Sequence, residues 1–275
     1  MLLNKFIAGG ACVMLSIFAL SACKNTGGNA RGDKDSSAIA AQKPGTPIQL
    51  NPNKKYIFLT WDDSPQPPGT FNCERIFREQ GVKATFFSVG MHMFDNLRKR
   101  IVDTLRNSYP QFLLGNHSHS HGFQDHYRTY YAHPDSALKD MLLGAQELGV
   151  QVKIARLPGM NAWVEHGKIQ APPSSRAVCK LMDSIGYCTI GWDVEWQFTK
   201  RATPVQSAQQ MADMVATKLA DGTTYAQNAI VILAHDRMFR EPQYADSLTK
   251  FITLLKQDTN YVFETVDHYP LVQNK

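Results

Sequence analysis

The sequence predicts an α/β protein with a largely parallel sheet, built as a single domain. From about residue 55 onward, short apolar runs alternate with segments of helical spacing, an order typical of repeated strand–helix units. The runs are apolar along nearly their whole length, which indicates strands buried on both faces. The roughly 220 residues involved are enough for one hydrophobic core.

Seven apolar runs have the composition of buried strands, and six segments between them have helical spacing. The expected strands are Tyr56–Trp61, Ala84–Val89, Phe112–Asn116, Val152–Leu157, Tyr187–Asp193, Ala229–Ala234 and Tyr261–Thr265. The expected helices are Cys73–Glu79, Met93–Asn107, Ala137–Leu148, Ser175–Ile185, Ser207–Leu219 and Asp246–Lys256. Seven strands fit a barrel better than a small open sheet, and the pattern by itself allows both.

Ionisable residues gather where these strands end and are scarce within them. They are Asp62 and Asp63, His117 and His121, Arg156, Asp193 and Glu195, and His235 and Asp236. In barrels of parallel strands, catalytic residues lie at the carboxyl ends of the strands and on the loops that follow. The sequence therefore predicts a catalytic site at this edge of the sheet.

Three histidines within five residues, His117, His119 and His121, follow the third strand. Imidazole nitrogens suit Zn²⁺ and similar ions. His117 and His121 share a face if the segment turns helically, whereas His117 and His119 share one if it is extended. A surface cluster without a ligand role is the alternative, and the position after a buried strand argues against it. With Asp63 as a third ligand, the set leaves positions open for water and substrate, as a catalytic site requires.

The pair Asp62–Asp63 ends the first strand, and His235 ends the sixth. Neighbouring side chains on an extended backbone point in opposite directions, so one carboxylate can bind a metal while the other faces a nucleophilic water. The composition Asp-Asp-Ser-Pro also fits a solvated turn, and a lone histidine after an apolar run also fits a core residue. Beside a metal centre, His235 is suited to general acid catalysis near neutral pH.

Five segments resemble the motifs of the polysaccharide deacetylases related to the rhizobial chitooligosaccharide deacetylase, carbohydrate esterase family 4. They are Leu59–Ser64, Gly115–His121, Arg156–Pro158, Trp192–Trp196 and Ile232–Asp236, in the order of the family. The resemblance spans roughly residues 55–265, and the first, second and fifth motifs together are highly specific.

The resemblance implies a distorted (β/α)₇ barrel that removes N-acetyl groups from an amino-sugar polysaccharide. It also implies a divalent metal. We expect Zn²⁺, with Co²⁺ or another transition metal as the alternatives. The residues that match the family's metal ligands are Asp63, His117 and His121. Such a metal polarises the amide carbonyl, and a backbone N–H after the first motif would help to stabilise the oxyanion.

The remaining roles also follow from the resemblance. Asp62 would be the general base, Arg156 would hold that base by a salt bridge, and His235 would protonate the leaving amine. His119 fills a variable position of the second motif and receives no role.

Three features of the chain depart from the family pattern. Ser64 replaces the usual glycine of the first motif, which puts the oxyanion donor in question. The third motif lacks the usual aromatic residue after Pro158, so the wall of the substrate-binding groove expected from the family is in question at this position. The fourth motif is compressed, so either Asp193 or Glu195 could orient the catalytic histidine, and we favour Asp193.

Residues near the strand ends, most of them aromatic, are candidates for substrate contacts. Trp61, Pro158 and Trp192 are expected to bind substrate. The four tryptophans, Trp61, Trp163, Trp192 and Trp196, can stack on sugar rings, but at least half of them are expected to pack in the core.

Two other functions are compatible with these residues. The same machinery could hydrolyse a different linear amide, since a fold does not determine its substrate. A catalytically inactive sugar-binding lipoprotein could retain the groove, although the intact set of base, ligands and acid argues against it.

The N-terminus has the pattern of an export signal. Lys5 precedes an apolar run from Phe6 to Leu20 that is too short to span a membrane comfortably. Leu-Ser-Ala before Cys23 resembles the lipobox of bacterial lipoproteins, in which that cysteine is lipidated; an ordinary secretory signal with an incidental Cys23 is the alternative. We expect a signal peptide at residues 1–22, the lipidated Cys23 and a flexible tether at 23–53, and the deacetylase domain at 54–275.

These segments predict an exported protein held to a membrane by its lipid. Lys24 does not resemble the inner-membrane retention signal, which favours the outer membrane in a Gram-negative cell. Cys179 and Cys188 could form a local disulfide, or both could be buried thiols. The net charge of +5 is scattered and indicates no nucleic-acid surface. We expect a monomer.

Overall fold

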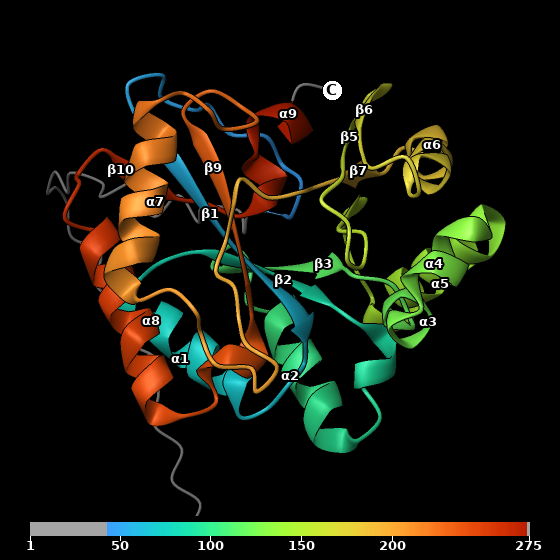
Figure 1. Cartoon of the computed structure of the whole chain (residues 1–275), viewed down its shortest axis with the longest axis horizontal. Coiled ribbons are helices and arrows are strands. Elements are labelled where there is room, and N and C mark those ends of the chain that lie inside the picture. The colour runs from blue at the N-terminus through green and yellow to red at the C-terminus, as the bar shows by residue number, and fades with distance from the viewer. Residues whose placement is uncertain (1–42, 274–275) are drawn as a thin grey trace, which may run out of the picture. The chain divides into compact units, whose positions relative to one another are not determined.

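One mixed β-sheet organises the part of the chain that the computed structural model describes, residues 43–273. Its strands are β1 (Lys55–Ser64), β2 (Ala84–Ser88), β3 (Phe112–Asn116), β4 (Ile154–Ala155), β5 (Trp163–Glu165), β6 (Lys168–Gln170), β7 (Cys188–Thr189), β8 (Val194–Glu195), β9 (Ala229–His235) and β10 (Tyr261–Phe263). The strand order is β6-β5-β7-β4-β3-β2-β1-β9-β8, and β10 pairs with the start of β1. The sheet curls without a pairing between its two end strands (Figure 1), an incomplete barrel consistent with the distorted barrel that the family resemblance implies.

All seven expected strands are present, and their pairing is parallel along β7-β4-β3-β2-β1-β9. The antiparallel hairpin of β5 and β6 and the short β8 are not among the predicted strands. These strands have only two or three residues and include charged ones, so no apolar run marks them, whereas the equally short β4 and β7 lie within longer apolar runs.

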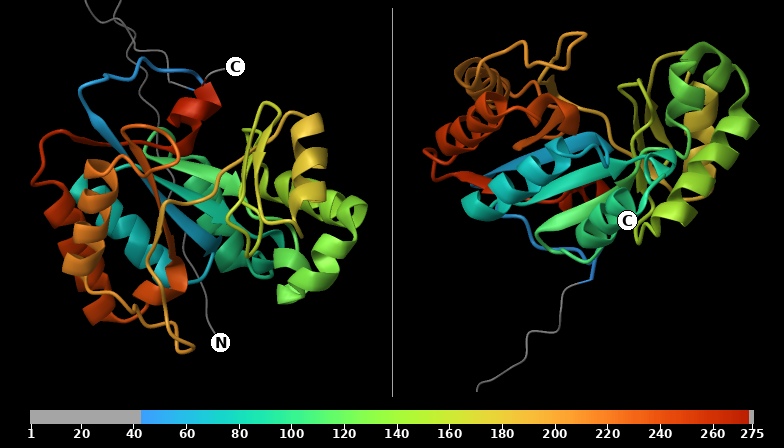
Figure 2. Two further views of the ribbon diagram at one scale, coloured as in Figure 1. Left: turned by 45° about the horizontal axis from the view of Figure 1, so that its top comes forward. Right: turned by 90° about the horizontal axis from the view of Figure 1, so that it is seen from below.

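Helices cover the sheet in two groups (Figure 1, Figure 2). Helices α1 (Gly69–Gln80), α7 (Ala208–Ala220) and α8 (Pro242–Leu255) pack together near β1 and β9, and α2 (Asn96–Arg106) packs near β3. Helices α4 (Tyr127–Ala132), α5 (Pro134–Leu148) and α6 (Arg176–Ser184) form the second group near β4 to β7. The remaining short helices are α3 (His121–Asp125), α9 (Pro270–Gln273) and three 3₁₀ turns at Gly90–His92, Asp236–Phe239 and Val266–His268.

The alternation of side chains along β1 determines which residue reaches the site. Ile57, Leu59 and Trp61 pack in the core between the sheet and its helices. Tyr56 and Phe58 pack on the opposite face, inside the curl of the sheet. Because side chains alternate along a strand, Asp62 continues the inward series.

The N-terminal predictions fall partly outside the described residues. The signal peptide and Cys23 lie outside them. Within the expected tether, residues 43–53 contact the domain: Gly45 N donates to Asp267 Oδ2 at 2.9 Å, and Ile48 N donates to Gln273 Oε1 at 2.6 Å. No helix within residues 43–273 is long and apolar enough to cross a bilayer.

The alternative of a disulfide between Cys179 and Cys188 does not hold. Cys179 is a buried free thiol, and burial raises its pKa to about 11. An unreactive buried thiol behaves as a small apolar side chain.

Candidate active site

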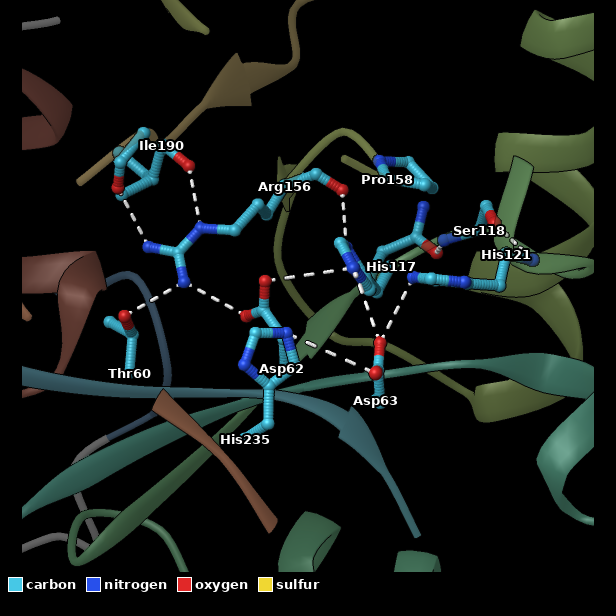
Figure 3. Close-up of polar contacts among 12 residues, drawn as sticks. Thr60, Asp62, Asp63, His117, Ser118, His121, Arg156, Pro158, Ile190 and His235 are labelled. Atoms are coloured by element: carbon cyan, nitrogen blue, oxygen red, sulfur yellow. Dashed lines mark hydrogen bonds and ion pairs between the residues drawn. The ribbon is translucent and has the colours of Figure 1, made fainter. Parts of the chain in front are cut away.

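The carboxyl ends of β1, β3, β4 and β9 carry the ionisable residues that the sequence places at strand ends. Asp62 in β1 lies directly opposite His235 in β9. His117 follows β3 immediately, and Arg156 follows β4. Figure 3 shows these side chains converging on one another. The expectation that they gather at one edge of the sheet is confirmed.

A β-bulge at the end of β1 turns both neighbouring aspartates into the site. The pairing register with β2 shifts between Asp62 and Ser64, and Asp63 has a φ of 72°. As a result, Asp62 Oδ2 lies 3.6 Å and Asp63 Oδ1 lies 3.7 Å from the same atom, His117 Nε2. Side chains that would diverge on a regular strand therefore converge, a common effect of bulges beside active sites.

Asp63, His117 and His121 offer ligand atoms that lie within 4.8 Å of one another. His121 Nε2 is 3.0 Å from Asp63 Oδ1. That oxygen is buried and accepts no hydrogen bond of suitable geometry, so a cation would satisfy it. Two imidazoles and one carboxylate match the donor set of a catalytic zinc-type site with open positions.

The ionisation of two of these residues suits a metal. Burial raises the pKa of Asp63, but His121, His235 and His117 outweigh it and hold the pKa well below its usual value. Burial and the charge of His121 lower the pKa of His117 to about 3. His117 Nδ1 donates to the Arg156 carbonyl oxygen at 2.8 Å, so the neutral ring presents Nε2 to the site.

Arg156 holds Asp62 in place. Its guanidinium is fully buried and donates to Asp62 Oδ1 and to Thr60 Oγ1, each at 2.8 Å. It also donates to the carbonyl oxygens of Ile190 and Gly191, at 3.0 and 2.7 Å. Burial raises the pKa of the Asp62 carboxyl, partly opposed by Arg156. Because Arg156 holds Oδ1, Oδ2 is the oxygen that faces the three candidate metal ligands, Asp63, His117 and His121.

His235 lies beside the two aspartates, at the end of β9. Its Nε2 is 3.9 Å from Asp63 Oδ2, and its ring packs edge-on against Phe198 with centroids 4.8 Å apart. Burial lowers the pKa of His235, against the opposing effects of Asp63 and Asp62. Its Nδ1 is buried without a hydrogen-bond partner.

The prediction that Asp193 orients His235 is wrong. The Asp193 carboxylate accepts hydrogen bonds from the backbone N–H groups of Tyr225, at 2.6 Å, and Val231, at 2.7 Å. Val231 precedes His235 by four residues in β9, about 13 Å along a strand. The alternative residue, Glu195, pairs with Leu233 in β9 and lines the same pocket as His235.

Ser64, which replaces the usual glycine of the first motif, is hydrogen-bonded to Asp236 of the fifth motif. Ser64 Oγ donates to Asp236 Oδ2 at 2.6 Å, and Thr70 Oγ1 donates to the same oxygen at 2.5 Å. All three side chains are buried. Burial raises the pKa of Asp236 to about 7, although both hydroxyl groups oppose it. Asp236 thus ties the loop after β1 to the end of β9.

A pocket of about 280 Å³ opens beside these residues. It is lined by Asp62, His117, His121, Tyr127, Gly159, Trp192, Glu195, Phe198, Leu233, His235 and Arg237. Trp192 is half-buried at this pocket, as expected of a substrate contact.

Two other expected substrate contacts do not line the pocket. Trp61 is fully buried between Phe77 and Phe239 because it belongs to the outward series of β1. Pro158 is buried as well, and Gly159 beside it faces the pocket instead. Trp163 and Trp196 also pack in the core, so the expectation that at least half of the tryptophans do so is confirmed.

Four polar residues around Asp63 and His121 were not among the predicted site residues. Arg237 donates to Asp63 Oδ2 at 2.6 Å, and His92 Nδ1 lies 2.7 Å from the Asp63 carbonyl oxygen. Asp125 and Tyr127 lie against His121. Arg237 directly follows the fifth motif, which was a signal for its position, whereas nothing in the sequence pattern singled out the other three.

Comparisons with known proteins agree with the motifs and the fold. A family model for polysaccharide deacetylase matches residues 49–158. The peptidoglycan-N-acetylglucosamine deacetylase of Bacillus cereus is 24% identical over 219 residues, which cover 78% of this chain and 87% of that protein. The chitin disaccharide deacetylase of Vibrio alginolyticus is 23% identical and covers 78% of this chain and 71% of that protein.

A solved structure shows the same fold. The Streptococcus mutans CE4 esterase superposes with a TM-score of 0.59 at 23% identity, over 78% of this chain and 87% of that one. Motifs, fold and similarities point to a single family. The chain is similar to the polysaccharide deacetylases over residues 49–158, and its domain has the fold of a carbohydrate esterase of family 4.

Proposed function

We propose that the protein removes N-acetyl groups from an amino-sugar polysaccharide of the cell envelope, such as peptidoglycan, poly-N-acetylglucosamine or a chitin-like polymer. The observation that carries this proposal is the convergence of Asp63, His117 and His121 beside the pair formed by Asp62 and Arg156. The names of the Bacillus and Vibrio relatives, a peptidoglycan and a chitin disaccharide deacetylase, support this class of substrate.

The metal proposed for the site is Zn²⁺, with Co²⁺ or another transition metal as alternatives. Asp63 Oδ1 and the Nε2 atoms of His117 and His121 would hold it. When bound, it supplies Lewis acidity for the amide carbonyl and for the attacking water.

Asp62 is placed to act as the general base. Its Oδ1 is held by Arg156, so Oδ2 accepts the proton of the attacking water. Burial raises the pKa of Asp62 above its usual value, which favours proton transfer to it.

His235 is placed to protonate the leaving amine. It reaches the pocket from β9, across from His117. Because burial lowers its pKa, the protonated ring gives up its proton more readily. An amine leaves as a neutral group only when it is protonated, so this transfer completes the hydrolysis.

The pocket walls suit a sugar. Tyr127, Trp192 and Phe198 line it with aromatic rings, and aromatic rings pack well against the apolar faces of pyranoses. Glu195 and Arg237 add one carboxylate and one guanidinium that can hydrogen-bond to hydroxyl groups.

We also propose that the enzyme acts from a membrane, as an exported lipoprotein anchored through Cys23. The sequence of the first 23 residues supports this. Incorporation of labelled fatty acid into the wild type but not into Cys23→Ser tests it, and equal labelling of both would contradict it.

Acetate release from N-acetylglucosamine oligomers tests the chemical proposal. The metal-loaded wild type is expected to release acetate, and Asp62→Asn and His235→Ala are each expected to lower kcat by about 10²-fold or more. His119→Ala is the control, because His119 Nδ1 faces Glu147 Oε2 at 2.6 Å on α5. A metal-loaded wild type without activity on any amino-sugar polymer would overturn the proposal. An Asp62→Asn variant as active as the wild type would refute the base assignment.

A further inference from the structure

The loop that carries His121 contains a left-handed helical turn. Five successive residues, His121–Asp125, have φ values of 52°, 64°, 56°, 54° and 68°. Only Gly122 among them lacks a side chain that disfavours this conformation. Such backbone persists only where surrounding contacts impose it, and it is concentrated at functional sites.

The turn brings Asp125 back to His121. The two residues are four positions apart, and Asp125 Oδ1 accepts a hydrogen bond from His121 Nδ1 at 2.6 Å. A carboxylate only accepts hydrogen bonds, so Nδ1 carries the proton and Nε2 is the nitrogen available to a metal. That Nε2 lies 3.0 Å from Asp63 Oδ1. The turn therefore determines both the orientation and the tautomer of a proposed metal ligand.

Tyr127 fixes the position of Asp125. Its hydroxyl donates to the same atom, Asp125 Oδ1, at 2.8 Å. Its ring packs edge-on against the ring of His121, with centroids 5.9 Å apart. The Asp125 side chain is 70% exposed. Its two hydrogen-bond partners, His121 and Tyr127, nevertheless both lie at the site.

Two glycines make the slot in which the Tyr127 ring lies. A Cβ atom on Gly122 would come within 2.8 Å of Tyr127 Cδ1, and one on Gly159 would come within 2.9 Å of Tyr127 Cε2. Both glycines have positive φ, 64° and 65°. The ring thus lies between the His121 turn and the loop after Arg156. The backbone at Gly122 and at Gly159 restricts its movement toward either segment.

We propose that Asp125 and Tyr127, with the left-handed turn, are positioning residues that hold His121 for metal binding. The inference rests on the proposed role of His121 as a metal ligand. It concerns metal affinity, which is measured without substrate, so it can fail while the deacetylase proposal stands, and the reverse also holds.

Competition for Zn²⁺ between the full protein and a chromophoric chelator tests the inference. Asp125→Ala is expected to weaken Zn²⁺ binding by about tenfold, because hydrogen bonds to ligating histidines typically contribute that much or more. Asp125→Asn retains an oxygen that accepts from Nδ1, and asparagine tolerates the left-handed conformation, so it should recover most of the affinity. Tyr127→Phe should show a smaller loss than Asp125→Ala.

A matched control is the contact between His119, in the same loop, and Glu147 in α5. His119 Nδ1 and Glu147 Oε2 form another histidine–carboxylate contact of 2.6 Å, and no metal ligand takes part in it. Glu147→Ala should leave the Zn²⁺ dissociation constant within about twofold of the wild type, and thermal melting checks the folding of every variant. Wild-type affinity in Asp125→Ala, or an equal loss in Glu147→Ala, would overturn the inference.

Discussion

At the scale of single residues, the ion pair of Arg156 and Asp62 controls the ionisation of Asp62, the proposed base. Arg156 is fully buried, and Asp62 is 3% exposed. Removing one partner of such a pair leaves the other charge buried without compensation. The arginine also has π contacts with Phe87, at 4.5 Å to the ring centroid, and with Trp192 at 5.8 Å. A change at Arg156 should therefore affect both ionisation and stability.

Substitution of Arg156 by methionine should move the acidic limb of the pH–rate profile to higher pH. The positive charge of Arg156 lowers the pKa of Asp62, so its loss raises that pKa further, and the carboxyl then stays protonated up to a higher pH. The expected loss of stability is about 3–5 kcal/mol. The profile of kcat/KM against pH and a urea titration measure the two effects.

Arg156→Lys is the informative companion variant. It keeps the charge but cannot donate to Asp62, Ile190 and Gly191 together. It should shift the acidic limb less than the methionine variant does. An unshifted limb in Arg156→Met would show that Arg156 does not tune the base.

At the scale of elements, the strands and the long helices follow from the sequence, whereas the site loops do not. Buried parallel strands are apolar throughout, so β1 and β9 were recognisable from composition. The β8 strand has two residues, so nothing in its pattern could decide between Asp193 and Glu195. The left-handed turn at His121–Asp125 costs about 1–2 kcal/mol for each non-glycine residue. Contacts distant in sequence, such as that of Gly159 with Tyr127, offset this cost, so no local pattern could predict the turn.

Helix α1 gives a prediction about stability and pH. Glu74 in this helix is 7% exposed, and its Oε1 has no hydrogen-bond partner. Burial raises its pKa from 4.5 to about 7, against the opposing charge of Arg78. Between those two pH values the folded protein binds more protons than the unfolded chain, so this residue lowers stability as pH rises through that window.

Glu74→Gln should remove that dependence. At pH 8 the variant should be more stable than the wild type by about 1–2 kcal/mol, and at pH 4 the difference should nearly vanish. Glu79→Gln in the same helix is the control, because Glu79 forms an exposed pair with Arg75. Chemical denaturation at both pH values measures the differences, and an advantage for Glu74→Gln that is larger at pH 4 would contradict the account.

At the scale of the whole molecule, the N-terminal side of the domain is tied to its C-terminal end. Gly45 and Ile48 donate backbone hydrogen bonds to Asp267 and Gln273, and Leu50 packs against the core inside the curl of the sheet. A chain that begins at residue 54 should therefore be less stable than one that begins at residue 43, by about 2 kcal/mol. Thermal melting of the two forms tests this. Equal melting temperatures would show that residues 43–53 add nothing to the stability of the domain.

The whole site depends on one group of three ligands from two strand ends and a loop, Asp63, His117 and His121. Acetate release from N-acetylglucosamine oligomers, before and after treatment with a chelator and again after addition of Zn²⁺, tests it most directly. The chelator should abolish release, and Zn²⁺ should restore it in the wild type but not in Asp63→Asn. Undiminished release from the metal-free protein would contradict it.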